Sequence, residues 1–534
     1  MSEKPKKLTR EDIAKLEIGV TAISRGQKIL LCAFFLGMLA IYPVWQTIHE
    51  LKNTPDNEKC VLQSFTIFER FARTRPDTSK PLPTMLNDFN KQLIAAIGDY
   101  EDALDDASAL RALLLAPVQA AMTKYLGFGN DSVVVGDDGY LFFTDDFSYV
   151  VNPGFMRSDK MHKRALSGVQ PNPIEAIVDF RDQLAARGIE LVLLPVPVKP
   201  MMYADKLGGD ITPVNNPDYA AFLRQLAELD INVVDITSEL AALRGSGVET
   251  YLKTDTHWTP EAMHLAATLV AEAIGGAPSG IEPNREVTAL GDIAIMLRLD
   301  EPEALFPLET VSVHEVDSTP NSDARVLLLG DSFVNIYSLG AMNWGIRAGF
   351  AENLAYLLDE PIDVLARNDA ASYATRQLLA NELRRGRDRL AGKEVVVWQF
   401  VMRELLHGDW RVIDMTLGDA PEEQFFVPTE PVNITATVLA ATPAPRPGSA
   451  PYKDHIIALH LGDIDGGDEQ ALVFAVSMRD NVWQPAASLR PGEKVTIKLS
   501  PWSEAELEYG SWNRTEFDSP DLMLQEPVWG EIEK

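Results

Sequence analysis

Two short segments of the chain carry the residue types that acyl-transfer chemistry requires. The first contains Ser332 within Gly330-Asp331-Ser332-Phe333, directly after the apolar run 326–329. A serine in a strand-to-helix turn is accessible, and backbone N–H groups of the turn can point at a developing oxyanion. Glycine, aspartate and serine are also common turn formers, so for these residues alone an ordinary turn at a strand end is the better explanation.

The second segment, residues 254–260, reads Thr-Asp-Thr-His-Trp-Thr-Pro. Thr259 as N-cap and Pro260 at the first helical position predict that a helix begins here. Asp255 and His257 then lie in the preceding loop, and side chains two residues apart in extended backbone share one face. The carboxylate can orient one imidazole nitrogen while the other faces a serine, as a Ser–His–Asp relay requires. The alternative is a loop with a surface histidine and a packed tryptophan.

Two neighbouring residues compete for the roles of base and acid. His264 lies seven residues after His257, inside the predicted helix, where a histidine packs or faces solvent. Of the eight histidines, only His257 has an acidic residue two positions before it. Asp331 adjoins Ser332, but an aspartate in a tight turn usually binds its own backbone.

The elements that must position these residues are those of an α/β domain. Over residues 130–408, strand-like and helix-like runs alternate, which predicts a doubly wound parallel sheet. A hairpin with Asp138-Gly139 at its turn is predicted to open this region over 132–143. The predicted strands are 189–198, 231–237, 324–330, 362–366 and 394–400, and the predicted helices include 174–188, 220–230 and 260–274.

An uncharged apolar run over residues 29–45 predicts a membrane anchor. Residues 1–28 carry seven basic and four acidic side chains, so the positive-inside rule places them in the cytoplasm. We therefore expect a cytoplasmic tail (1–28), an anchor (29–48) in the inner membrane and a periplasmic remainder. A cleaved signal peptide and a buried core helix are the alternatives. Residues 49–125 have helical periodicity and predict a stalk.

Residues 410–534 change character, because short alternating apolar runs separated by turn signals replace the helices. This pattern predicts a small β-sandwich-like or barrel-like module. Trp483, Trp502 and Trp512 could bind a glycan, but we expect them to pack the core of the module. An acidic cluster over 463–468 lacks the rest of a calcium loop and is interpreted as a turn.

Composition excludes several classes of function. The formal net charge is −30, and so acidic a chain repels phosphate backbones, which argues against binding nucleic acid. A polyanionic substrate would need a local basic patch. The only cysteines are Cys32 and Cys60, which excludes a cysteine zinc site. We expect no disulfide, no metal and no cofactor.

Together, the two motifs resemble the AlgJ/AlgX-like alginate O-acetyltransferase family, whose members contain an SGNH hydrolase-like domain. In that family the Asp-x-His motif precedes the serine motif, as Asp255-Thr256-His257-Trp258 precedes Gly-Asp-Ser-Phe here. Segments 136–142, 197–199 and 397–400 add to the resemblance, which covers roughly residues 130–408.

The resemblance implies that Ser332 is the nucleophile, His257 the general base and Asp255 its orienting acid. It also implies acetylation of an exported polysaccharide, through an acetyl-serine intermediate and beside a membrane-bound O-acyltransferase that supplies acetyl groups. Two other functions stay open: a deacetylase or esterase, if water replaces the sugar, and a non-catalytic polysaccharide-binding scaffold.

The chain departs from the family where accessory groups are expected. No clear counterpart of the accessory oxyanion donors is found in the sequence. Asn368, after the predicted strand 362–366, is a candidate donor or an ordinary loop residue. Arg403, after the predicted strand 394–400, could contact a polyanion or form a salt bridge with an acidic neighbour.

Overall fold

The computed structural model describes residues 24–53 and most of residues 107–534. Between 54 and 106 it describes positions 85, 89, 90, 93, 94, 97, 98, 100, 101 and 104. Not described after 107 are residues 278, 279, 281, 369, 420–424, 446, 448–451, 518, 533 and 534. The chain divides into two compact units, Met1–Val118 and Gln119–Lys534. The predicted boundaries 130–408 and 410–534 fall within the second unit and stay predictions.

The first unit contains α2 (Arg25–Asn53), the one helix among the described residues that is long and apolar enough to cross a membrane. Its apolar side chains between Ile29 and Leu51 are mostly exposed, an arrangement that favours a lipid surrounding over water. The buried amide of Gln46 donates from Nε2 to the Ala107 carbonyl oxygen (2.6 Å). Its Oε1 accepts from the Ala109 N–H (3.0 Å).

Two of the expected N-terminal segments are described only in part. The tail over 1–28 lies outside the described residues up to residue 23. Of the stalk over 49–125, residues 54–84 lie outside them as well. Where the structure describes the end of this segment, α5 (Ala109–Leu126) is helical.

The second unit is organised around a five-stranded sheet whose paired strands are all parallel, as the sequence predicts. The strand order is β4-β3-β9-β7-β8. Apolar runs dominate the central strands because both faces of the sheet are covered, so β7 and β9 are buried along their whole length. The strands are β3 (Glu190–Val196), β4 (Asn232–Val233), β7 (Val326–Gly330), β8 (Asp363–Ala366) and β9 (Val395–Val401).

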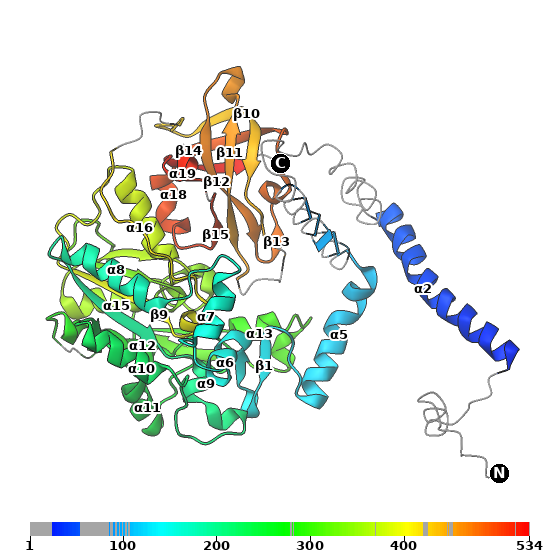
Figure 1. The fold of residues 1–534 in the computed structure, drawn as a ribbon, viewed down its shortest axis with the longest axis horizontal. Helices are drawn as coiled ribbons and strands as arrows, with labels where there is room; N and C mark the ends of the chain where they lie inside the picture. Colours follow the sequence, from blue (N-terminus) through cyan, green and yellow to red (C-terminus); the bar gives the residue numbers. More distant parts are fainter. Residues whose placement is uncertain are drawn as a thin grey trace, which may run out of the picture. The chain divides into compact units, whose positions relative to one another are not determined.

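Helices alternate with these strands along the chain. They are α8 (Pro173–Ala185), α10 (Tyr219–Glu228), α12 (Pro260–Ala273), α15 (Phe350–Leu358) and α16 (Ala374–Arg384). Helix α8 packs on β3, and α16 packs on β7 and β8. Helix α12 packs on α15, and Figure 1 shows these two helices next to each other. The parallel α/β sheet is thereby confirmed, whereas the doubly wound arrangement of its helices stays a prediction.

Two hairpins flank the sheet, and the sequence predicted only one of them. Strands β1 (Val133–Val135) and β2 (Leu141–Phe143) form the predicted hairpin, with Asp138 and Gly139 at positive φ in its turn. The second hairpin pairs β5 (Arg285–Ala289) with β6 (Glu309–Val313). Between its strands lies the short helix α13 (Asp292–Met296).

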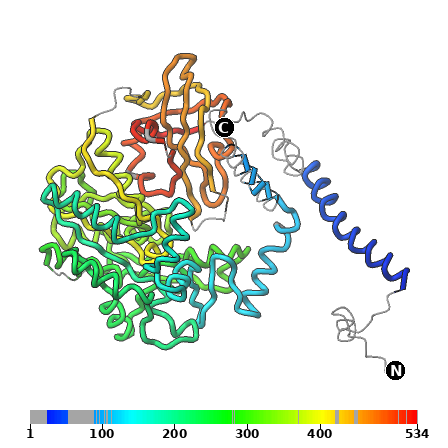
Figure 2. The backbone as a smooth tube through the Cα atoms, viewed as in Figure 1, coloured from blue at the N-terminus to red at the C-terminus, as the bar shows by residue number. Residues whose placement is uncertain are grey.

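The C-terminal strands close into a barrel. Each of five strands pairs with two neighbours in the cycle β10-β11-β12-β16-β14, and β14 returns to β10. Of the two architectures predicted for this module, the closed cycle is that of a barrel. Figure 2 shows these strands as long adjoining segments coloured orange to red. They are β10 (Val432–Ala441), β11 (His455–Gly462), β12 (Ala471–Arg479), β14 (Lys494–Pro501) and β16 (Pro527–Ile532), with β13 (Val482–Trp483) and β15 (Arg514–Thr515) at the edges.

Polar contacts join the barrel to the α/β part of the same unit. Arg367, directly after β8, donates to the Glu516 carboxylate (3.3 Å) and to the Arg514 carbonyl oxygen. Arg385 donates to the Met523 carbonyl oxygen (3.0 Å). Loops of the barrel are therefore held close to the carboxyl ends of the parallel strands, where the candidate site lies.

Candidate active site

Ser332 lies at the sharp turn between β7 and the short helix α14 (Ser332–Asn335). Asp331 caps this helix, and its carboxylate accepts from the N–H groups of Phe333 and Val401 (both 2.9 Å). The Gln399 side chain donates to the same carboxylate (2.9 Å). Asp331 therefore stabilises the turn, as predicted, and is not available to orient a histidine.

The structure brings the three sequence-predicted residues together. The Ser332 hydroxyl donates to His257 Nε2 (2.8 Å), and His257 Nδ1 donates to Asp255 Oδ1 (2.6 Å). All three side chains are more than nine-tenths buried. His257 and Asp255 lie in the loop before α12, whose N-cap is Thr259 as predicted. The arrangement can remove a proton from the serine and hold the resulting imidazolium.

Asp255 is held as a carboxylate by groups from three parts of the chain. Its Oδ1 also accepts from the His257 N–H (3.1 Å). Its Oδ2 accepts from the Asp292 N–H (3.0 Å) and from the Trp344 indole N–H (2.8 Å). Burial alone would raise the pKa of Asp255, but the hydrogen bond and charge of His257, with these N–H donors, lower it to about 2. The acid is therefore ionised throughout the physiological pH range.

The surroundings of His257 make it a stronger base than a free histidine. Burial alone would lower its pKa, because a charged imidazole is poorly solvated there. The hydrogen bond and charge of Asp255, and then the charge of Asp292, outweigh burial and raise the pKa. A raised pKa strengthens proton abstraction from Ser332 and favours the imidazolium that follows.

A buried lysine fixes the backbone of the His257 loop. Lys199 begins α9 (Lys199–Met202), shortly after the end of β3 at Val196, and its side chain is fully buried. Its ammonium donates to the carbonyl oxygens of Leu252 (2.9 Å), Lys253 (3.0 Å) and Asp255 (2.6 Å). Burial lowers the pKa of Lys199 to about 8. The ammonium thus gathers three carbonyl groups that would otherwise repel one another.

Glu309 of β6 holds the same loop from another side. Its carboxylate accepts from the N–H groups of Lys253 (2.8 Å) and Thr254 (2.9 Å) and from the Thr254 hydroxyl (2.6 Å). Gly291 then approaches the Thr254 backbone so closely that a Cβ atom would lie 2.2 Å from its carbonyl carbon. The second hairpin therefore contributes to the site by holding the loop that carries His257.

The rival histidine is placed away from the serine. His264 lies within α12, is partly buried, and its Nδ1 lies 3.2 Å from the Asn353 side-chain oxygen. Trp258, next to His257, is fully buried and packs edge-on against Phe333. The segment therefore contains a histidine that is buried beside a serine, and the alternative of a surface histidine is wrong.

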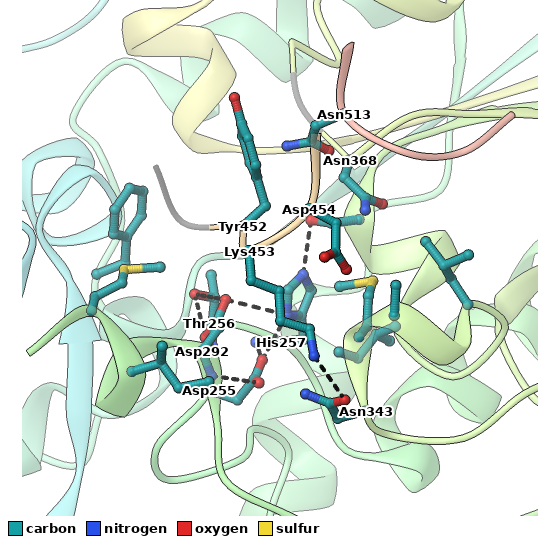
Figure 3. A pocket seen from close by; sticks show the side chains of 18 of the residues that line it. Asp255, Thr256, His257, Asp292, Asn343, Asn368, Tyr452, Lys453, Asp454 and Asn513 are labelled. Carbon is teal, nitrogen blue, oxygen red and sulfur yellow. Dashed lines mark hydrogen bonds and ion pairs between the residues drawn. The ribbon is translucent and has the colours of Figure 1, made fainter. Parts of the chain in front are cut away.

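A cavity of about 140 Å³ is lined by Ser332 and His257. Figure 3 shows His257 among the side chains that surround it. One wall comes from the α/β part of the unit and includes Asp255, Asp292 and Asn343. The opposite wall comes from loops of the barrel. Its residues are Tyr452, Lys453, Asp454, Asn481, Trp512 and Asn513. The barrel therefore helps to form the candidate site.

Asn368 and Arg403 both line this cavity. Asn368 Oδ1 accepts from the Asn335 side chain (2.8 Å), one turn after Ser332, so the described residues leave the Asn368 amide nitrogen without a partner. Arg403 donates to the buried carboxylate of Asp146 (2.9 Å). The acidic neighbour predicted for Arg403 is therefore present, while the guanidinium still borders the cavity.

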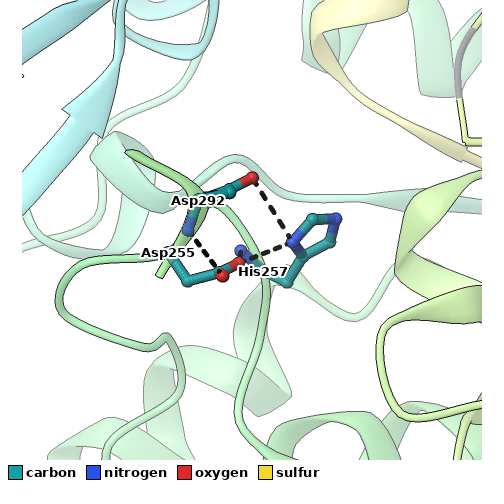
Figure 4. A group of neighbouring side chains, drawn as sticks. All are labelled: Asp255, His257 and Asp292. Atoms are coloured by element: carbon teal, nitrogen blue, oxygen red, sulfur yellow. Dashed lines mark hydrogen bonds and ion pairs between the residues drawn. The ribbon is translucent and has the colours of Figure 1, made fainter. Parts of the chain in front are cut away.

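Asp255, His257 and Asp292 form a compact group of titratable side chains, with the relevant atoms within 4.8 Å of one another (Figure 4). Residue types of this kind can bind a metal ion. Here both carboxylate oxygens of Asp255 and both ring nitrogens of His257 already take part in hydrogen bonds. The group is therefore described as a hydrogen-bond network, and the expectation of no metal stays a prediction.

The tryptophans predicted to pack the barrel differ in their surroundings. Trp502 and Trp512 are buried in one apolar cluster of the module, as expected. Trp483 is 52% exposed, and its indole N–H donates to the Pro445 carbonyl oxygen (2.8 Å). The core-packing prediction is thus wrong for Trp483, because the short edge strand β13 leaves this side chain outside the barrel.

Comparison with known proteins yields a consistent group of relatives. A family model described as "SGNH hydrolase-like domain, acetyltransferase AlgX" matches residues 133–402, about half of the chain. A probable alginate O-acetylase AlgJ of Pseudomonas syringae is 30% identical over 52% of this chain and 62% of that protein. Another of Pseudomonas putida is 27% identical over 54% of this chain and 74% of that protein.

Among solved structures, the O-acetyltransferase domain of Pseudomonas putida AlgJ is 24% identical, with a TM-score of 0.40. That match covers 51% of this chain and 92% of the domain. For the Pseudomonas syringae relative, the chain spans less than two thirds of the relative's length.

Replacing Lys199 by methionine is expected to misplace the base. Without the ammonium, the carbonyl groups of Leu252, Lys253 and Asp255 lose a shared donor, and the loop relaxes. Because small displacements of a reacting group are costly, we expect Ser332 to react with a fluorophosphonate probe ~10-fold or more slowly. The rate of labelling of the full chain in detergent measures this.

Lys206→Met is the matched control. Lys206 lies seven residues after Lys199 and forms an ion pair with Asp138 (2.6 Å), whereas Lys199 binds three carbonyl groups. We expect wild-type labelling from this variant. Wild-type labelling by Lys199→Met would show that the three hydrogen bonds of Lys199 do not position His257.

Proposed function

Because this chain belongs to the family of the SGNH hydrolase-like domain of acetyltransferase AlgX, we propose that it is an O-acetyltransferase of an exported polysaccharide. One observation carries the proposal: the continuous hydrogen bonds from Ser332 through His257 to Asp255 end in a cavity large enough for a small group. The names of the relatives favour alginate or a similar exopolysaccharide as the substrate.

The first half of the reaction transfers acetyl from a donor ester to the serine. Ser332 Oγ attacks the acetyl carbonyl carbon while His257 Nε2 takes the hydroxyl proton. The tetrahedral intermediate collapses, its bond to the donor oxygen breaks, and that oxygen leaves with the proton from His257. Asp255 stays ionised and stabilises the imidazolium between these proton transfers. The product is an acetyl-serine ester.

The second half repeats these steps with a sugar hydroxyl. The hydroxyl gives its proton to His257 Nε2 and attacks the acetyl-serine carbonyl carbon. The bond to Ser332 Oγ then breaks, and His257 returns the proton to the serine. Water in place of the sugar would give hydrolysis by identical steps, so exclusion of water and binding of the acceptor decide between transfer and hydrolysis.

We assign stabilisation of the oxyanion to the Ser332 N–H and the Asn368 amide. Among the described residues neither donor has a hydrogen-bond partner, and the Ser332 N–H lies at the first position of α14, where a backbone N–H has no acceptor within the helix. Asn335 supports this assignment because it engages Asn368 through the oxygen and leaves the nitrogen to donate. Donors of this type typically contribute ~10²-fold or more to the rate.

The barrel wall of the cavity is the proposed acceptor site. Asn513 is 1% exposed, and neither atom of its amide has a hydrogen-bond partner within the described residues. An unpaired buried amide costs free energy that a sugar hydroxyl, both donor and acceptor, can recover. Arg403 and Lys453 add positive charge to the cavity of an otherwise acidic chain, although each is paired with an aspartate.

We place the chain in the inner membrane with its second unit in the periplasm. The apolar helix α2 and the basic residues before it support an uncleaved anchor over 29–48 with a cytoplasmic N-terminus. A substrate that is exported and a donor that starts in the cytoplasm require acetyl groups to cross this membrane. We therefore propose a membrane-bound O-acyltransferase as the partner that delivers them.

Replacing Ser332 by alanine is expected to abolish acetyl transfer. The assay follows release of a chromogenic alcohol from its acetyl ester by the full chain in detergent, with and without mannuronate oligosaccharides. We expect release by the wild type that oligosaccharide accelerates, with acetylated sugar detected by mass spectrometry. Loss of the nucleophile should reduce release by at least ~10³-fold.

Ser246→Ala is the control for this substitution, because Ser246 is an exposed serine in the turn after α11 (Thr237–Gly245) and is not among the residues that line the cavity. Serine-dependent release that no sugar affects would indicate an esterase. Absence of release by the wild type would contradict an enzymatic role for Ser332 and favour a scaffold.

Replacing Asn513 by alanine is expected to weaken acceptor binding alone. Removal of one donor and one acceptor from the barrel wall should raise the KM for oligosaccharide by ~10-fold. Hydrolysis of the small ester without acceptor should stay at the wild-type rate. Asn433→Ala, on the exposed face of β10, is the matched control. Equal loss of both activities in Asn513→Ala would contradict a role confined to the acceptor.

The membrane orientation has a direct test. In a Gram-negative host we expect the full chain to stay in the membrane after carbonate extraction. Protease added to spheroplasts should degrade the second unit and leave an N-terminal fragment that contains the protected helix α2. Release of the chain by carbonate, or resistance of the second unit to protease, would contradict the proposed topology.

A further inference from the structure

Asp292 is a carboxyl group of the cavity to which the proposed reaction assigns no part. It begins α13, and its Oδ2 lies 3.9 Å from His257 Nδ1, the nitrogen that donates to Asp255. Two carboxyl groups therefore face one ring nitrogen, and only that of Asp255 is at hydrogen-bond distance (Figure 4). The side chain of Asp292 is 24% exposed, so the second carboxyl group is in contact with the cavity.

Asp292 and the loop that carries Asp255 and His257 are joined by hydrogen bonds in both directions. Asp292 Oδ1 accepts from the Thr256 N–H (2.7 Å), and Oδ2 accepts from the Thr256 hydroxyl (2.9 Å). In the other direction, the Asp292 N–H donates to Asp255 Oδ2 (3.0 Å). Thr256 lies between Asp255 and His257 in the sequence. Asp292, the first residue of α13, therefore binds Asp255 through its N–H and holds the loop of Asp255 and His257 through its carboxylate.

The environment allows the charge of Asp292 to change near neutral pH. Burial, and then the negative charge of Asp255, raise its pKa to about 7. The positive charge of His257 and the hydrogen bonds from Thr256 oppose this rise. The charged groups around the network are Asp255, His257, Lys199 of α9, Glu309 of β6, Arg403 of α17 (Arg403–His407), and Lys453 and Asp454 of the barrel.

We propose that Asp292 is a positioning residue for the base: it holds the Asp255–His257 loop through Thr256 and, when ionised, stabilises the imidazolium formed as His257 takes a proton. The second half of this statement rests on the proposed acyl transfer. A neutral imidazole has no net charge for the carboxylate to attract, whereas an imidazolium carries a positive charge. The interaction is thus made in the transition state and not in the resting enzyme, which is the condition for accelerating a reaction.

These charges decide in which direction the pKa of His257 changes when Asp292 is replaced. Ionised Asp292 stabilises protonated His257, so it raises the pKa of the imidazole. An asparagine keeps an oxygen for the Thr256 N–H but carries no charge. In Asp292→Asn the imidazole should therefore lose its proton at lower pH than in the wild type. The rate should also reach a lower plateau at high pH, because the imidazolium is less stabilised in the transition state.

The test combines two readouts on the full chain in detergent. The first is the titration of the His257 imidazole by NMR with ¹³C-labelled histidine, assigned with His257→Gln. The second is the pH profile of acetyl-ester release. We expect Asp292→Asn to lower the pKa of His257, to shift the acid limb of the profile to lower pH, and to lower the plateau by ~10-fold at unchanged Tm. Asp292→Glu should recover a raised pKa.

Glu261→Gln is the matched control, since Glu261 is an exposed carboxylate in the first turn of α12, close in sequence to His257. It should leave both readouts unchanged. An unchanged His257 titration in Asp292→Asn would overturn the electrostatic part of the proposal, and a uniform loss of rate with the limb in place would reduce Asp292 to a structural clamp. A shifted titration in a protein without Ser332-dependent release would instead refute the proposed function and leave the assignment of Asp292 intact.

Discussion

A carboxylate without access to water is the constraint on which the site depends. Removing an ionised group from water costs several kcal/mol unless its oxygen atoms accept hydrogen bonds from well-placed donors. Asp255 is 2% exposed, and its donors come from separate segments: the His257 ring and N–H, the Asp292 N–H and the Trp344 indole. The fold must therefore bring all of these segments to one point before Asp255 can be buried as a carboxylate beside His257.

The parallel sheet meets this constraint because the carboxyl ends of its strands converge. Strand β7 ends at the serine turn, which Gln399 of β9 ties down through Asp331, and Lys199 follows the end of β3. These three strands are neighbours in the order β3-β9-β7. Ser332, its turn and Lys199 thus follow three adjacent strands that are buried along most of their length, and such strands are rigid supports for groups that must stay within hydrogen-bond distance.

Much of this arrangement could be predicted from local patterns. The i, i+2 spacing of Asp255 and His257 and the strand-end position of Ser332 predicted their proximity, and apolar runs predicted the parallel strands. Asp292 and Trp344 could not be found in this way, because each reaches the site through tertiary contacts and lies in no recognisable motif. Closure of the barrel could not be predicted either, because it depends on which strands pair. The alternation of apolar and polar residues within one strand does not specify its partner.

The barrel wall of the cavity is built from loops that share one end of the barrel. Residues 452–454 precede β11, residue 481 follows β12, and residues 512–513 precede β15. These loops are separate in sequence from the strands that carry Ser332, so exchanges within them leave the hydrogen bonds of the acid and base untouched. Under the proposed function, such a division would allow the preference for one polysaccharide over another to diverge during evolution while Ser332, His257 and Asp255 are inherited unchanged.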